Sequence, residues 1–71
     1  MTKPEQLKQY RAEMGLSQTE LANKYSQLFT DNFGVKLNVA NIKCWEQGKN
    51  TLSPLLNFLL KTLEKDLTAI Q

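Results

Sequence analysis

Apolar residues recur every three or four positions along most of this chain, which is the rhythm of amphipathic helices. No stretch of useful length alternates apolar and polar residues as a strand does, and the chain has no internal repeat. The pattern predicts an all-α fold, one compact domain of four to five helices over residues 1–71. Helices are expected over residues 3–14, 18–30, 39–47 and 54–66, and the tail 67–71 has the composition to extend the last one.

Capping residues mark the ends of these segments. Ser17 and Glu20 form a capping-box pattern before the second helix, and Asn38 is a good N-cap for the third. Gly48 is the expected left-handed stop of the third helix, and Ser53–Pro54 opens the fourth with proline in the first turn.

A long connection, residues 31–38, separates the second and third helices. Its turn residues Asp31 and Asn32 are followed by Val35 and Leu37, whose side chains are expected to tuck back onto the core. The apolar positions expected to face inward elsewhere are Leu7, Tyr10, Met14, Leu21, Ala22, Tyr25, Leu28, Phe29, Ile42, Trp45, Leu55, Leu56, Leu59, Leu60 and Leu63.

The composition narrows the kinds of protein that this chain can be. With 71 residues, one cysteine (Cys44) and no histidine, it has neither a disulfide nor a histidine metal site to support a thin core. The start, Met1–Gln6, has no apolar signal stretch, and the apolar-rich segment 52–60 is too short to span a bilayer. We therefore expect a protein of a reducing cytoplasm, with no membrane partner, no cofactor and no small-molecule ligand.

Catalysis is not expected from this set of residues. The chain has no histidine, no metal-ligand cluster, no glycine-rich phosphate loop and three glycines in all. The net charge of +2 is only mildly basic, so an argument for nucleic acid has to rest on where the charges lie.

Two segments carry a resemblance to a known family. Leu16–Ala22 (LSQTELA) followed by Asn41–Lys49 (NIKCWEQGK) resembles the lambda-repressor-like (Cro, XRE) helix-turn-helix family over roughly residues 7–63. The resemblance implies a sequence-specific, double-stranded DNA-binding transcriptional regulator, a small repressor that reads the major groove with helix 39–47.

The connection departs from that family, because about ten extra residues separate Gln18 from Ile42. POU-specific domains of eukaryotic regulators are similar in lengthening the second helix and this turn. No homeodomain follows here, so we favour an independent regulator of bacterial or phage type, associated with the nucleoid. The POU-like alternative implies a nuclear protein.

The resemblance implies five base-reading positions in the third helix, at Val39, Ala40, Asn41, Lys43 and Cys44. An asparagine can pair with adenine, a lysine can reach guanine acceptors, and small apolar groups can contact a thymine methyl. The alternative is that Val39 and Ala40 pack inward and that Lys43 is a solvated charge.

The resemblance also implies contacts with DNA phosphates around the third helix. A lone lysine is usually only solvated, but basic and amide groups that converge on one helix favour a nucleic-acid footprint. The candidate phosphate contacts are Gln18, Lys36, Asn38, Gln47, Lys49 and Asn50.

Three further residues receive structural interpretations. Arg11 and Glu46 lie at family positions that form a partly buried ion pair, which implies that Arg11 is not on the DNA face. Trp45, three residues after Ile42, is typical of a core aromatic.

A protein-binding module on the same scaffold is the alternative function, as in an antitoxin, an antirepressor or a regulatory subunit. Phe33, Val35 and Leu37 would serve that role if they were exposed. A homodimer through the C-terminal helix is a third hypothesis, with half-sites about 34 Å apart on DNA. It rests on the apolar surface of Leu56, Leu59, Leu60, Leu63, Leu67 and Ile70.

Overall fold

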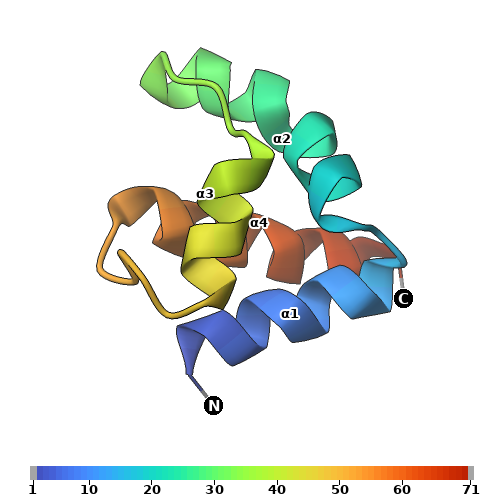
Figure 1. Ribbon diagram of the computed structural model, residues 1–71. Helices are drawn as coiled ribbons and strands as arrows, with labels where there is room; N and C mark the ends of the chain where they lie inside the picture. The colour runs from blue at the N-terminus through green and yellow to red at the C-terminus, as the bar shows by residue number, and fades with distance from the viewer. Residues whose placement is uncertain (1, 71) are drawn as a thin grey trace.

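The computed structural model describes residues 2–70, which form four helices and, over that range, no strand (Figure 1). Helix α1 spans Lys3–Met14, α2 spans Gln18–Phe33, α3 spans Val39–Glu46 and α4 spans Pro54–Ile70. The predicted all-α class is confirmed. Gln71, at the end of the expected tail, lies outside the described residues.

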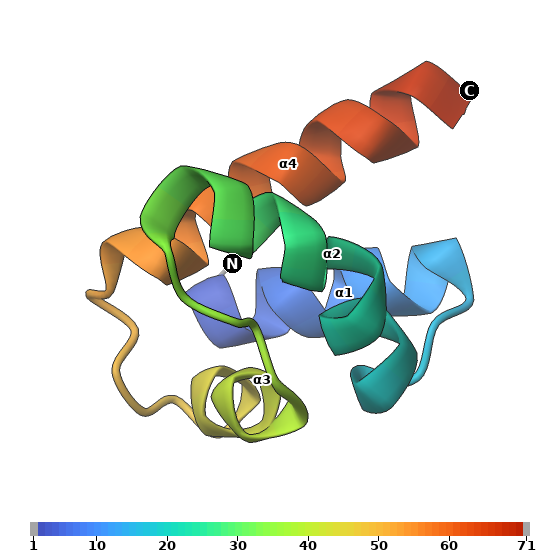
Figure 2. The same ribbon diagram turned by 90° about the horizontal axis from the view of Figure 1, so that it is seen from above.

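The four helices surround one core. Helix α1 packs against α3 and α4, and α2 packs against α3. Figure 2 shows the long helix α4 crossing the molecule, with its C-terminal part extending past the other helices. The side chains that fill the space between the helices are Leu7, Leu21, Ala22, Tyr25, Phe29, Leu37, Ile42, Trp45, Leu56, Leu59, Leu60 and Leu63.

The starts of the helices follow the local capping signals. Ser17 Oγ accepts a hydrogen bond from the backbone N–H of Glu20 at 3.1 Å, and the Glu20 carboxylate accepts one from the Ser17 N–H at 2.9 Å. This reciprocal pair satisfies two of the N–H groups that a helix start leaves without partners. It begins α2 at Gln18, as predicted.

Helix α2 runs one turn further than predicted, to Phe33 instead of residue 30. Asp31 and Asn32 do not form the expected turn, because both side chains bond back along the helix. Asp31 Oδ1 accepts from Gln27 Nε2 at 2.8 Å, and Asn32 Nδ2 donates to the Leu28 carbonyl at 2.8 Å. The helix ends only at Gly34, whose φ of +69° is a left-handed conformation suited to glycine.

The extra turn of α2 is held by aromatic packing. The ring centroid of Phe33 lies 5.7 Å from that of Phe29 and 5.0 Å from that of Phe58, and the Phe29 and Phe58 centroids lie 5.5 Å apart. The Phe58 pairs are edge-to-face, the arrangement that the ring quadrupoles favour. The three rings join the end of α2 to α4.

The connection to α3 is therefore residues 34–38 rather than 31–38. Leu37 is 3% exposed and packs into the core as predicted, but the same prediction for Val35 is wrong, since Val35 is 43% exposed. Residues two positions apart share a face only in a regular extended segment, but the chain bends at residues 34–35, so Val35 does not follow Leu37 into the core.

A partly buried hydrogen bond also ties α2 to α4. The Tyr25 hydroxyl donates to Asp66 Oδ2 at 2.6 Å and lies 3.7 Å from the sulfur of Met14. Burial raises the pKa of the Tyr25 phenol, and the hydrogen bond to Asp66 and the negative charge of Asp66 raise it further. The phenol therefore stays protonated well beyond the pH at which a free tyrosine ionises.

Helix α4 continues beyond residue 66 to Ile70, so residues 67–70 of the expected tail are helical. Its leucines do not form the surplus apolar surface expected for a homodimer, because this chain's own core buries Leu56, Leu59, Leu60 and Leu63. Leu67 is half-buried, and the side chain of Ile70 lies outside the described residues. No helix within residues 2–70 has the length and apolar character that a membrane crossing requires.

We predict that Phe29→Ala lowers the free energy of unfolding by about 3–5 kcal/mol, because it removes a fully buried ring and opens a cavity beside Phe33 and Phe58. The milder Phe29→Leu should cost about 1 kcal/mol, which keeps the measurement possible if the alanine variant does not fold. Leu52→Ala is the control: Leu52 is 88% exposed, so we expect a change within about 0.5 kcal/mol. Urea denaturation followed by circular dichroism measures all three, and equal losses for Phe29→Ala and Leu52→Ala would contradict the packing.

The raised pKa of Tyr25 predicts a loss of stability in alkali. The unfolded phenol ionises near its ordinary pKa of 10.0, whereas the folded phenol remains protonated. The contribution of Tyr25 is therefore complete below pH 10 and is lost as the pH rises toward the higher folded pKa. Denaturation curves from pH 8 to 11 should show a steeper fall for the native chain than for Tyr25→Phe; parallel curves would mean that the Tyr25 pKa is not shifted.

Candidate nucleic-acid interface

Local capping interactions define both ends of the short helix α3. At its start, Asn38 Oδ1 accepts a hydrogen bond from the backbone N–H of Asn41 at 3.1 Å. At its end the chain turns at Gly48, whose φ is +88°, and the Lys49 N–H returns to the Cys44 carbonyl at 2.9 Å. Both caps were predicted from the sequence, and they leave eight helical residues with defined ends.

One face of α3 is fixed to the rest of the protein. Ile42 is fully buried, Trp45 is 4% exposed, and Glu46 is 7% exposed beside them. Trp45 is thus a core residue, as predicted. The remaining residues of the helix lie on the opposite face or on its edges, where they are exposed or half-buried.

An ion pair joins the end of α3 to α1. Arg11 Nε donates to Glu46 Oε2 at 2.8 Å and Nη2 donates to Oε1 at 3.1 Å, so the pair is bidentate, as the resemblance implied. Arg11 Nη1 also donates to the Leu16 carbonyl at 3.2 Å. The hydrogen bond to Glu46 raises the pKa of the guanidinium despite partial burial, so Arg11 remains charged. Its donors are used within the fold, which keeps it off the outer face.

Gln18 is part of the same network. Its Nε2 donates to Glu46 Oε1 at 3.1 Å, so the first residue of α2 contacts the last residue of α3. The sequence predicted only a phosphate contact for Gln18. One of its two amide hydrogens is instead used by Glu46, which leaves the second available for another acceptor.

The five candidate base-reading residues do not all share one face. Ala40 and Lys43 are exposed, and Val39 and Cys44 are half-buried at the edges of the outer face. Ala40 on the exposed face and Cys44 at its edge carry small side chains with little capacity for directional hydrogen bonds. Lys43 is the one charged group among the five.

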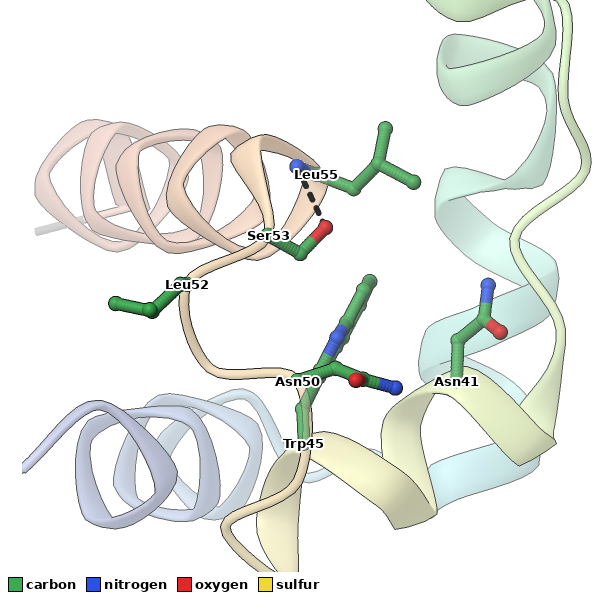
Figure 3. Close-up of a pocket in the computed structure, with 6 residues that line it drawn as sticks. All are labelled: Asn41, Trp45, Asn50, Leu52, Ser53 and Leu55. Atoms are coloured by element: carbon green, nitrogen blue, oxygen red, sulfur yellow. Dashed lines mark hydrogen bonds between the residues drawn. The ribbon is translucent and has the colours of Figure 1, made fainter.

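Asn41 lies toward α4 rather than at the centre of the outer face. It lines a cleft between α3 and the start of α4, together with Trp45, Asn50 and Leu55. Figure 3 shows Asn41 on the α3 side of this cleft and Leu55 at the start of α4. Asn41 is half-buried there, so it is less open to a partner on the outer face than the sequence suggested.

The remaining candidate phosphate contacts surround α3. Exposed side chains at this end of the molecule are Lys36, Asn38, Gln47, Lys49 and Asn50. Asn38 uses its side-chain oxygen as the helix cap, which leaves its amide hydrogens for other acceptors. Asn50 has a positive φ of 55°, a conformation that asparagine tolerates better than most residues.

The charges around α3 are unbalanced. Residues 34–53 contain three lysines, Lys36, Lys43 and Lys49, and one acidic residue, Glu46. The Glu46 carboxylate is neutralised by Arg11, so the three lysines have no acidic counterpart within this segment. An exposed, locally cationic face suits an anionic partner.

Over the part of the chain that the structure describes, no group of three or more cysteine or acidic side chains could hold a metal ion.

Sequence reasoning missed two contacts of this region. The Gln18–Glu46 hydrogen bond joins residues 28 positions apart and has no local signal. Lys3 Nζ donates to the Thr51 carbonyl at 3.2 Å, and these residues lie 48 positions apart, so this contact has no local signal either. The sequence does contain a signal for one surface feature of this region. Thr19, Asn23 and Ser26 recur at helical spacing and form a polar stripe on α2.

Comparison with protein-family models, with curated proteins and with solved structures found no match to this chain.

The ion pair predicts an asymmetric response to mutation. Arg11→Met should lower the free energy of unfolding by about 3 kcal/mol, because the Glu46 carboxylate is then left nearly buried with Gln18 as its remaining side-chain partner. Glu46→Gln should cost about 1–2 kcal/mol, because the Arg11 side chain is 23% exposed and can turn toward water. Urea denaturation of both variants and of the double variant gives the coupling energy; losses that simply add would exclude a direct interaction.

Proposed function

We propose that this protein is a sequence-specific, double-stranded DNA-binding transcriptional regulator, a small repressor. In this proposal α2 and α3 form a helix-turn-helix, and α3 enters the major groove. The resemblance of residues 16–22 and 41–49 to the lambda-repressor-like family supports it. The proposal assigns the protein no catalytic role.

The observation that carries the proposal is the contrast between the two faces of α3. The inner face is held by Ile42, Trp45 and the bidentate Arg11–Glu46 pair, so the helix has a fixed orientation. The outer face is open and has lysines on its border. An eight-residue helix is about 12 Å long, which matches the width of about 12 Å of the major groove.

In the mechanism we propose, one set of residues contacts the DNA phosphates and another set recognises the bases. Lys49, Lys36 and the amides of Gln18, Asn38, Gln47 and Asn50 contact phosphates, which sets the register of α3 without sequence preference. Lys43 then reaches guanine acceptors, and the apolar groups of Val39, Ala40 and Cys44 contact thymine methyls. Asn41 reads a base only if its side chain turns out of the cleft beside Trp45. Repression follows because the bound protein blocks access to the DNA.

The proposal includes a homodimer that reads two half-sites about 34 Å apart. The leucines buried in the core cannot supply its contact. The end of α4, which extends past the other helices and includes half-buried Leu67, is the part of this helix still available for a second copy.

A protein-binding module is the second candidate function, and the exposure of two apolar residues favours it. Phe33 is 41% exposed and Val35 is 43% exposed at the end of α2. Leu37, the third residue of the expected apolar protrusion, is buried, so the surface is smaller than the sequence indicated.

Fluorescence anisotropy with a random-sequence DNA duplex at several salt concentrations tests the DNA proposal. The native chain should bind at low salt, and its affinity should fall steeply as salt rises, because phosphate contacts release counterions. The double variant Lys43→Ala, Lys49→Ala should reduce the log–log salt slope by about one to two units.

The matched control is Lys61→Ala, Lys65→Ala, which removes the same charge from exposed positions of α4. It should leave the slope close to that of the native chain. Equal losses in the two double variants would indicate a nonspecific charge effect rather than contact through α3. No binding by the folded native chain at low salt would reject the DNA proposal and favour the protein-binding module.

A further inference from the structure

A cleft of mixed polar and apolar lining lies between the first half of α2 and the segment that leads into α3. It has a volume of about 420 Å³. The residues that line it are Thr19, Ala22, Asn23, Ser26, Lys36, Leu37, Asn38 and Val39. Figure 1 shows this connection running beside α2 into α3. The lining residues Asn38 and Val39 place the cleft next to the N-terminal end of α3.

The α2 wall of the cleft presents hydrogen-bonding groups. Thr19, Asn23 and Ser26 lie at positions i, i+4 and i+7, so their side chains follow one another along a single face of the helix. Thr19 and Asn23 are exposed and Ser26 is half-buried. Ala22 beside them is 2% exposed, and its small side chain leaves room between α2 and the connection.

The opposite wall supplies the charge. Lys36 is exposed and is the one charged residue that lines the cleft. Leu37 anchors this wall because its side chain is 3% exposed in the core, which fixes the position of its neighbour Lys36 along the chain. No acidic side chain lines the cleft, and nearby Glu20 uses its carboxylate to accept from the Ser17 N–H.

One ammonium group facing a row of hydroxyl and amide donors suits a singly charged anion that offers several oxygen acceptors. A phosphodiester group has this chemistry. The cleft also adjoins Asn38 and Val39 at the start of α3, so a DNA strand that borders the outer face of α3 passes its opening.

We propose that this cleft holds one backbone phosphate of the DNA, with Lys36 supplying the charge and Asn23, Ser26 and Thr19 supplying hydrogen bonds. The inference rests on the proposed DNA-binding function and extends it. The five-residue connection and the α2 stripe together form a backbone contact that the tight turn of a short helix-turn-helix has no residues to make.

Anisotropy titrations of a random-sequence duplex across a series of salt concentrations test this site. Lys36→Ala should reduce the log–log salt slope by about one unit, the value for one lost phosphate contact. Lys65→Ala removes the same charge from α4 and should leave the slope unchanged. Asn23→Asp places a carboxylate in the cleft with almost no change of shape, and it should weaken binding about tenfold at low salt.

Asn57→Asp, at an exposed position on α4, is the control for the added negative charge and should weaken binding far less. If the native chain does not bind the duplex at all, the proposed function fails. If the native chain binds but Lys36→Ala and Asn23→Asp behave like their α4 controls, DNA binding stands and this site is wrong.

A titration with inorganic phosphate alone, followed by the amide NMR shifts of Asn23 and Ser26, separates the two sources of phosphate. Weak binding that does not saturate at millimolar concentrations is expected if the cleft needs the DNA strand to hold its phosphate. Saturation by free phosphate, together with an unchanged DNA salt slope in Lys36→Ala, would overturn the DNA assignment.

Discussion

An eight-residue helix cannot hold its shape through its own hydrogen bonds, so the outer face of α3 exists only because other parts of the chain fix its inner face. The bidentate pair between Arg11 and Glu46 supplies the directional part of that constraint. Two parallel hydrogen bonds at 2.8 and 3.1 Å define both the position and the rotation of the C-terminal end of α3 relative to α1. Gln18 adds a contact from α2 to the same carboxylate, so three helices converge on one side chain.

The long α2 is a second constraint on the same face. Because α2 continues to Phe33, the chain has to return along the helix before α3 can begin, and Gly34 makes that reversal. The return path is held at Leu37, which is buried, while its neighbours are exposed. The longer α2 and the returning segment therefore add surface beside α3 without loosening the core.

Local signals in the sequence were sufficient for the helix starts and for most of the core. Ser17 and Glu20 predict the start of α2 because a capping box involves only neighbouring residues. The end of α2 was not predictable in this way, since it depends on Phe33 meeting Phe58, 25 positions later. The candidate site shows the same contrast between what could and could not be predicted. The family resemblance implied the Arg11–Glu46 pair, whereas the position of the Asn41 side chain beside the start of α4 depends on tertiary packing.

The division of α3 into an anchored face and an open face has a consequence for how such a protein can diversify. Ala40 and Lys43 are exposed and are absent from the core, so exchanging them alters what the helix touches and leaves the stability of the domain nearly unchanged. In the proposed function, mutational tolerance is then concentrated on the face that contacts the bases. Under that proposal, single substitutions on this face change what the protein prefers to bind, with no need for compensating changes in the scaffold.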